Sequence, residues 1–179
     1  MSWLEETTTA LLAAFPEGVA AMPTADEIPQ FQVDRGHLRA VAEWLKANGA
    51  NMCLDIGGVD YLTMARTPRF EVVYHFLHLP TDGSSNGFGK LRLRVPVPEE
   101  KPEVATVSDL WEAANPAERE IWDLYGIRFP GHPNLTRILM PDEWEGHPLR
   151  KDYPLQGPRA NELTLEPADV NRFHPFKAP

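Results

Sequence analysis

The chain has 179 residues, and its 26 acidic residues outnumber its 17 basic ones, which gives a formal net charge of −9 at pH 7. This length is sufficient for a domain with a hydrophobic core, whereas the acidic balance argues against a nucleic-acid-binding protein, which needs a basic surface. The longest apolar run, residues 10–15, is too short for a membrane span of about 20 residues. The first residues lack the basic and apolar stretches of a secretory signal, so we expect a cytoplasmic protein.

Cys53 is the sole cysteine of the sequence. An intrachain disulfide is therefore impossible, and this chain alone cannot supply the several thiolates of an iron–sulfur cluster. We expect any redox cofactor to be held by another polypeptide.

Apolar periodicity predicts two helices and a short strand in the first fifty residues. The first helix covers residues 3–15 and is closed by Pro16. Residues 31–33 alternate as a strand does, and Asp34 is then the expected N-cap of a second helix that ends at Gly49. The apolar stripe of the second helix consists of Leu38, Val41, Ala42 and Leu45.

Three further segments have the composition of β-strands, namely residues 52–62, 69–79 and 90–97. Strands that follow one another without intervening helices favour antiparallel pairing. We therefore predict an α+β fold: a small, mostly antiparallel sheet of about four strands with helices packed on one face. His75 and His78 lie three apart in one predicted strand, so their side chains leave opposite faces and cannot share a metal ion.

Two more helices are predicted before residue 126. The first is short and covers residues 107–114. The second begins with Asn115 as its cap and Pro116 in its first turn, and Glu118 stands where it can bond back to the cap N–H. It ends at Gly126, so residues 1–126 are the predicted α+β domain.

Residues 127–179 are predicted to form a long, extended, proline-rich tail. Nine of these 53 residues are prolines, which lack an N–H group and fix extended geometry. Disorder is one interpretation of such a composition. The large apolar side chains favour the other one, a tail that docks on partner subunits. These side chains are Phe129, Leu135, Ile138, Leu139, Met140, Trp144, Leu149, Tyr153, Leu155, Phe173 and Phe176.

Two groups of residues invite a ligand-binding interpretation. The glycine-rich residues 83–90 lack the first glycine, the hydroxyl and the following helix of a phosphate-binding loop, so a hairpin loop is favoured. His132 and His147, with an acid from residues 142–145, could form a two-histidine, one-carboxylate metal site, although their spacing is long for one. Hydrogen bonding of both imidazoles to backbone or partner groups is the favoured interpretation.

A charged cluster occupies the last predicted helix. Glu120 and Asp123 are three apart and therefore neighbours on the helix surface, and paired carboxylates can perform acid–base chemistry. No nucleophile accompanies them, so a solvated or interface face is favoured. The cluster consists of Glu118, Arg119, Glu120 and Asp123. We assign no catalytic, cofactor-binding or metal-binding residue in this chain.

The order and spacing of residues 118–127, 131–133, 137–139 and 144–154 resemble the 30-kilodalton subunit family of respiratory complex I, the C subunit of NADH-quinone oxidoreductase. The residues that we assign to the family motif and to an interface are Glu118, Arg119, Glu120, Asp123, Gly126, Gly131, His132, Pro133, Arg137, Trp144, Gly146, His147, Arg150, Lys151 and Asp152. Acids and bases balance in number between residues 128 and 152, which suits ion pairs at a protein interface. We expect Arg150, Lys151 and Asp152 to act in assembly, with Arg150 clamping a partner carboxylate.

The resemblance implies a cofactor-free structural subunit in the peripheral arm of a proton-translocating complex that passes electrons from NADH through FMN and iron–sulfur centres to quinone. The implied partners are the homologue of hydrogenase large subunits, which is the D subunit of the complex, and the cluster-bearing B and I subunits. The implied location is the cytoplasmic side of the cell membrane, with membrane contact through the complex and no nucleic acid. Two alternatives stay open: the equivalent subunit of a membrane-bound hydrogenase or another donor-dehydrogenase complex, and an independent metal-dependent enzyme using His132, His147 and an acid.

Overall fold

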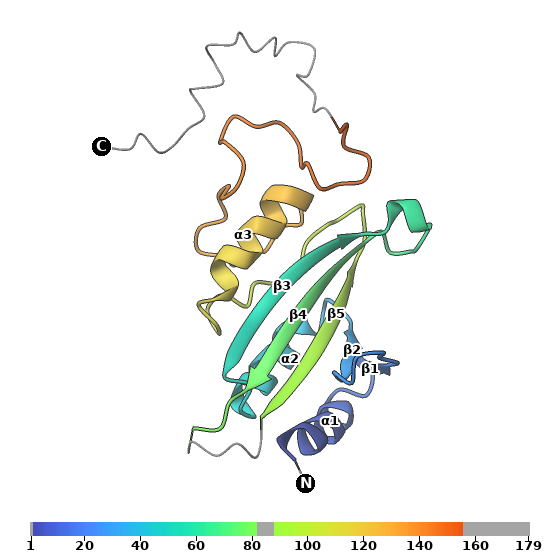
Figure 1. Cartoon of the computed structure of the whole chain (residues 1–179), viewed down its shortest axis with the longest axis vertical. Coiled ribbons are helices and arrows are strands. Elements are labelled where there is room, and N and C mark those ends of the chain that lie inside the picture. The colour runs from blue at the N-terminus through green and yellow to red at the C-terminus, as the bar shows by residue number, and fades with distance from the viewer. Residues whose placement is uncertain (1, 82–87, 156–179) are drawn as a thin grey trace, which may run out of the picture.

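The computed structural model of the chain describes residues 2–81 and 88–155, which form a five-stranded sheet, three α-helices and a C-terminal stretch without regular structure (Figure 1). The strands are β1 (Val19–Met22), β2 (Gln30–Val33), β3 (Met52–Asp60), β4 (Phe70–His78) and β5 (Gly89–Val97). The helices are α1 (Trp3–Ala14), α2 (Leu38–Ala47) and α3 (Ala114–Tyr125), with a 3₁₀ turn at Leu62–Met64. The predicted α+β class is confirmed. Most of the predicted hairpin loop, and residues 156–179 of the predicted tail, lie outside the described residues.

The strands lie in the order β1-β2-β5-β4-β3, and only β2 and β5 pair in parallel. The long strands β3, β4 and β5 form the predicted antiparallel meander. The sheet has one strand more than predicted, because β1 has four residues and its sequence, Val-Ala-Ala-Met, does not alternate. It pairs with β2 as a short ribbon at the edge of the sheet.

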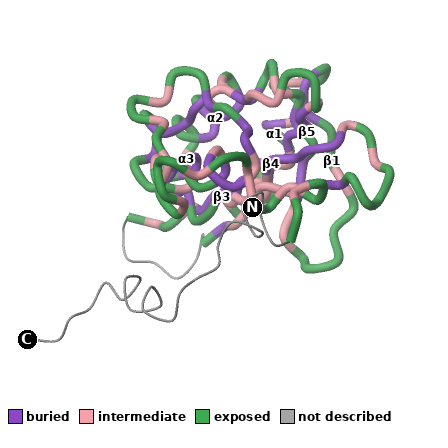
Figure 2. Tube along the Cα trace, turned by 90° about the horizontal axis from the view of Figure 1, so that it is seen from above, coloured by how far each residue is buried: buried purple, intermediate pink, exposed green. Residues whose placement is uncertain are grey.

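The hydrophobic core lies on one side of the sheet. Leu91, Leu93 and Val95 of β5 are fully buried there, and the alternate residues of the strand point to the opposite side. Figure 1 shows α2 behind the sheet, and Figure 2 shows buried residues gathered between the helices and the strands. The stripe of α2 that the sequence predicts is fully buried. Helices on one face are therefore confirmed for the described part of the chain.

Three local predictions are wrong. Asp34 does not cap α2, which begins at Leu38 and has His37 as its N-cap. The Asp34 carboxylate instead accepts the N–H of Gly36 in a local turn. Residues 107–113 form successive turns rather than a helix. Asn115 lies inside α3, whose N-cap is Ala113 and has no side-chain capping bond.

The chain continues to contribute to the core after α3. Ile127 is fully buried, Phe129 is 1% exposed, and both belong to the same apolar cluster as the sheet residues. Arg128 between them forms a parallel bridge with Glu103. The hydrophobic core thus includes residues on both sides of residue 126. None of the helices in the described ranges is long and apolar enough to cross a bilayer.

Candidate functional site

Asp123 of α3 anchors the segment of residues 127–155, which we call the C-terminal segment. Its side chain is fully buried. The Oδ2 atom accepts three backbone N–H groups, from Ile138 (3.0 Å), Leu139 (2.8 Å) and Met140 (2.9 Å). Burial opposes ionisation of this carboxyl, but these hydrogen bonds and the one from Arg137 hold its pKa below the usual value. Asp123 is therefore a structural anion, which corrects its assignment to a solvated or interface face.

Arg137 neutralises Asp123 and extends the same network. Its guanidinium pairs with Oδ1 of Asp123, and it donates to the backbone oxygens of Trp144 (2.7 Å) and Gly146 (3.1 Å). Only 12% of the Arg137 side chain is exposed. A guanidinium has several N–H donors in one plane. Arg137 therefore links α3, through Asp123, to the backbone of residues 144–146.

The residues around His147 cap the C-terminal end of α3. The last carbonyls of a helix have no partner inside it, and here they accept bonds from the C-terminal segment. Nδ1 of His147 lies 2.9 Å from the backbone oxygen of Asp123, so this nitrogen carries the proton. The N–H of Leu149 donates to the backbone oxygen of Leu124 (3.0 Å), and Nε of Arg150 donates to the backbone oxygen of Tyr125 (2.6 Å). Arg150 thus clamps a carbonyl of its own chain, where we expected a partner carboxylate.

Gly126 makes this cap possible. It adopts a left-handed conformation with φ of +74°, and a Cβ atom there would lie 2.5 Å from both His147 and Arg150. We expect Gly126→Ala to lower the free energy of unfolding by about 1–3 kcal/mol through backbone strain, and to expose residues 147–150 to limited proteolysis. Gly57→Ala is the matched control, because a Cβ at Gly57 has no heavy atom within 4 Å. Equal stability and equal cleavage of the two variants would contradict this role.

Arg69 joins the far end of the C-terminal segment to the sheet. It forms a two-pronged ion pair with Asp60 (3.0 and 2.8 Å) and a second one with Asp152 (3.0 and 2.8 Å). The N–H of Lys151 also donates to Asp60, at 2.8 Å. Burial disfavours the charge on Asp60, but the bonds from Arg69, Lys151 and Leu62 outweigh it and lower its pKa to about 2. The sequence analysis did not single out Asp60 and Arg69. The one signal that could have indicated their ion pair is that they are opposite charges at the adjoining ends of two apolar strands.

Glu118 is a buried acid of a different kind. Its carboxylate accepts the hydroxyl of Thr106 and the N–H of Val107 (2.7 Å), and it is fully buried. Among the described residues, no lysine or arginine pairs with it. Burial raises its pKa to about 7. Glu118 fixes the turn at residues 104–108 to α3, so it neither bonds back to Asn115 nor belongs to a solvated face.

The other motif residues divide into structural and exposed ones. Arg119 donates to the backbone oxygens of Thr136 (3.1 Å) and Arg137 (2.9 Å), and His132 contacts the backbone oxygen of Asn115 at 3.2 Å. Gly131 and Gly146 have positive φ angles, and Trp144 is half-buried. Besides Gly131 and Gly146, the exposed members are Glu120, Pro133, Lys151 and Asp152, the last paired with Arg69.

The contacts among these described residues hold the C-terminal segment against α3 and the sheet. His132 and His147 contact different backbone oxygens rather than a common point. Within residues 2–81 and 88–155, no three histidine, cysteine or acidic side chains lie together as metal ligands would. What the site does supply is an irregular segment, held by these contacts, with exposed apolar side chains, namely Ile138, Leu139, Leu149 and Leu155.

Residues 31–159 match the family model described as "Respiratory-chain NADH dehydrogenase, 30 Kd subunit". The chain belongs to this family. The 30-kDa subunit family includes the C subunit of the NADH-quinone oxidoreductase of Geobacter metallireducens, which is 47% identical over 127 residues, covering 70% of this chain and 74% of that protein. NADH-quinone oxidoreductase subunit 5 of Thermus thermophilus is 55% identical over 113 residues, 62% of this chain. That match spans 54% of the length of the Thermus protein.

A solved structure supports the same assignment to the 30-kDa subunit family. It is titled Nqo5 of the trypsin-resistant fragment (1-134), and it is 38% identical with a TM-score of 0.65, covering 74% of this chain and 99% of that one. A chain in the structure of a membrane-bound sulfane sulfur reductase, an archaeal respiratory membrane complex, shares the fold with a TM-score of 0.70 at 21% identity, over 97% of this chain and 92% of that one.

Proposed function

We propose that this chain is a cofactor-free architectural subunit in the peripheral arm of a proton-translocating NADH:quinone oxidoreductase. The observation that carries the proposal is the family match over residues 31–159. In this proposal FMN, the iron–sulfur centres and the quinone site belong to companion subunits. The chain contributes a folded domain and a fixed C-terminal segment against which companions pack on the cytoplasmic side of the membrane.

The chemistry of the C-terminal segment supports an interface. Buried ion pairs at Asp123 and Arg69 hold its backbone from within, while Leu139 is 58% and Leu155 fully exposed. Covering these apolar side chains with a partner lowers the free energy of the complex. Because the segment is already held in place, little conformational entropy is lost on binding. The companions that we propose are the hydrogenase-large-subunit homologue, which is the D subunit, and the cluster-bearing B and I subunits.

Lys151 is the motif residue best suited to test assembly without disturbing the fold. Its backbone N–H is anchored on Asp60, but its side chain is exposed. We expect Lys151→Glu to reduce the amount of assembled complex in membranes at least fivefold, measured by native gel, and to leave thermal unfolding of the isolated chain within about 2 °C. Lys46→Glu on the exposed side of α2 is the control. Normal assembly of the Lys151 variant would show that this side chain does not contribute to the interface.

Purification of the tagged chain from membranes tests the proposed function itself. We expect the D, B and I subunits as companions, with flavin and iron–sulfur absorbance in the assembled fraction and none in the isolated chain. Recovery of the chain alone, or with the subunits of a hydrogenase, would contradict the proposal.

A further inference from the structure

The side of the sheet turned away from the helices forms a continuous surface that faces the viewer in Figure 1. The register places Lys90, Arg92 and Arg94 of β5 on this side, with Val73 and His75 of β4 directly opposite Arg94 and Arg92. We call these five residues and their same-side neighbours the outer face. All five are half-buried, whereas the alternate residues of both strands, apart from His78, are buried in the core. In the described part of the chain, none of the three helices covers them.

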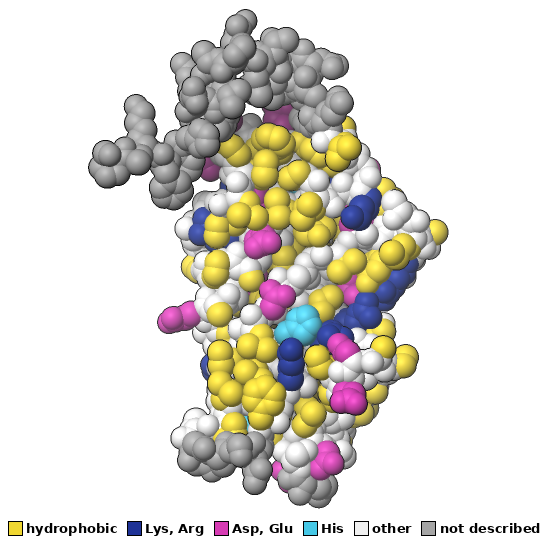
Figure 3. All heavy atoms as spheres, viewed as in Figure 1, with side chains coloured by type: hydrophobic (Ala, Val, Ile, Leu, Met, Phe, Trp, Pro, Cys, Tyr) yellow, Lys and Arg dark blue, Asp and Glu magenta, His cyan; other side chains and the backbone are white. Residues whose placement is uncertain are grey.

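Basic side chains recur at every second position of β5 on the outer face. Figure 3 shows a diagonal band of basic side chains beside a histidine, with hydrophobic and acidic side chains next to it. Alternate residues of a strand are about 6.5–7 Å apart, which is also the repeat of any extended peptide laid beside it. A row of three cations in a chain of net charge −9 therefore matches an extended segment that carries carboxylates at alternate positions.

The row already binds carboxylates within the chain. Arg94 pairs with the buried Glu71 at 2.6 Å, and Arg92 pairs with Asp26 at 2.7 Å. The side chain of Asp26 is 47% exposed and comes from a loop at the rim of the face. A guanidinium has five N–H donors, so an arriving carboxylate can join these partners or displace the exposed one.

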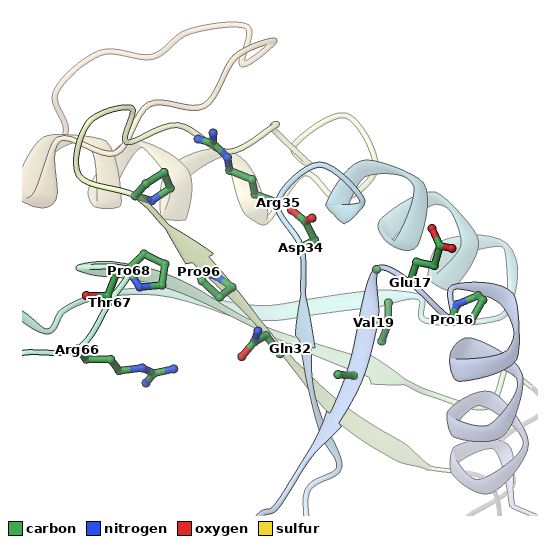
Figure 4. Close-up of a pocket in the computed structure, with 13 residues that line it drawn as sticks. Pro16, Glu17, Val19, Gln32, Asp34, Arg35, Arg66, Thr67, Pro68 and Pro96 are labelled. Carbon is green, nitrogen blue, oxygen red and sulfur yellow. The ribbon is translucent and has the colours of Figure 1, made fainter.

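A groove of about 720 Å³ lies at the end of the outer face where β5 diverges from β2. Figure 4 shows Gln32 at its base, Pro68 and Pro96 side by side along one wall, and Arg66 beyond them. At the opposite end of the face Met52 is 40% and Phe88 is 58% exposed. The surface thus has a groove with proline and polar lining at one end, exposed Met52 and Phe88 at the other, and the basic row between them, with Asp55 of β3 directly opposite His75.

We propose that the outer face docks an extended acidic segment of another polypeptide, whose alternate carboxylates face Lys90, Arg92 and Arg94 and whose apolar residues enter the groove beside Pro68 and Pro96. The inference rests on the proposed function only in expecting this polypeptide to be a companion subunit.

Site-specific photo-crosslinking tests the docking directly. Benzoylphenylalanine is placed at Val73 in the tagged full-length chain, expressed in its native host, and the crosslinked peptide is sequenced by mass spectrometry. Ala47 is the control position, because it is an exposed residue of α2, and α2 lies on the opposite side of the sheet from the outer face. We expect a crosslink at Val73 to a peptide of another subunit with at least two acidic residues at alternate positions. A peptide without them, a peptide from residues 156–179 of this chain, a second copy, or a yield equal to that at Ala47 would overturn the proposal.

A charge reversal supplies the second measurement. Lys90→Glu should lower the crosslinking yield at Val73 at least fivefold, and Lys46→Glu should leave it unchanged; equal yields would overturn the role of the basic row. If the chain co-purifies with its complex but Val73 forms no specific crosslink, this inference fails and the proposed function stands. If the chain has no respiratory companions but Val73 crosslinks an acidic segment of another protein, the proposed function fails and the docking surface stands.

Discussion

Replacing Asp123 by alanine should lower the free energy of unfolding by about 3–5 kcal/mol, because removal of one member of a buried ion pair leaves the other charge without a partner. Arg137 is that other member, and the N–H groups of residues 138–140 lose their shared acceptor. Urea unfolding of the isolated chain measures the loss. Hydrogen exchange should show that the backbone around residues 137–147 loses its protection first.

Glu120→Ala is the matched control for this experiment. It lies in the same helix three residues before Asp123, and its side chain is exposed. Substitutions at such positions usually change stability by no more than about 0.5 kcal/mol. If Asp123→Ala and Glu120→Ala unfold at the same urea concentration, the buried network does not hold the C-terminal segment.

Stability should also depend on the ionisation of Glu118. Its pKa is about 7 in the folded chain, against an ordinary value of 4.5. An acid with a raised folded pKa contributes stability that is fully present below the unfolded value and is lost as the pH rises through the folded one. The difference of 2.5 units (7 − 4.5) corresponds to about 3 kcal/mol, lost between about pH 4.5 and pH 7.

Comparison with Glu118→Gln isolates this contribution. Burial lowers the pKa of His75 and of His147, so these two groups add stability as the pH rises over an overlapping range. They are present in both proteins and cancel in the difference. We expect the variant to gain about 3 kcal/mol relative to the parent chain between pH 4.5 and pH 8. A difference that stays constant with pH would show that Glu118 does not take up a proton in the folded chain.

The sequence was informative about the fold wherever the signal is local. The alternation of residues 90–97 and the stripe of α2 depend on side chains a few positions apart, and both are confirmed. The predictions of helix starts were wrong where the same residue can either cap a helix or take another local structure. Asp34 forms a turn with Gly36 instead of capping α2, and α3 begins before the residue with the best capping chemistry, Asn115.

The candidate site was predictable as a set of residues but not as a set of contacts. Spacing alone placed Glu118, Glu120 and Asp123 on one helix, and only Glu120 is exposed. The burial of the other two depends on Thr106 and Arg137, which are 12 and 14 residues away from them along the chain. Such contacts exist only after the chain has folded back on itself, so no periodicity encodes them.

The most direct test of an architectural role is the NADH:quinone reductase activity of membranes from cells that lack this chain. We expect the assembled complex and its activity to disappear, to return when the intact chain is supplied, and to stay low with Asp123→Ala. The isolated chain should neither oxidise NADH nor absorb visible light. Full activity in a normally sized complex without this chain, or NADH oxidation by the chain alone, would contradict the account.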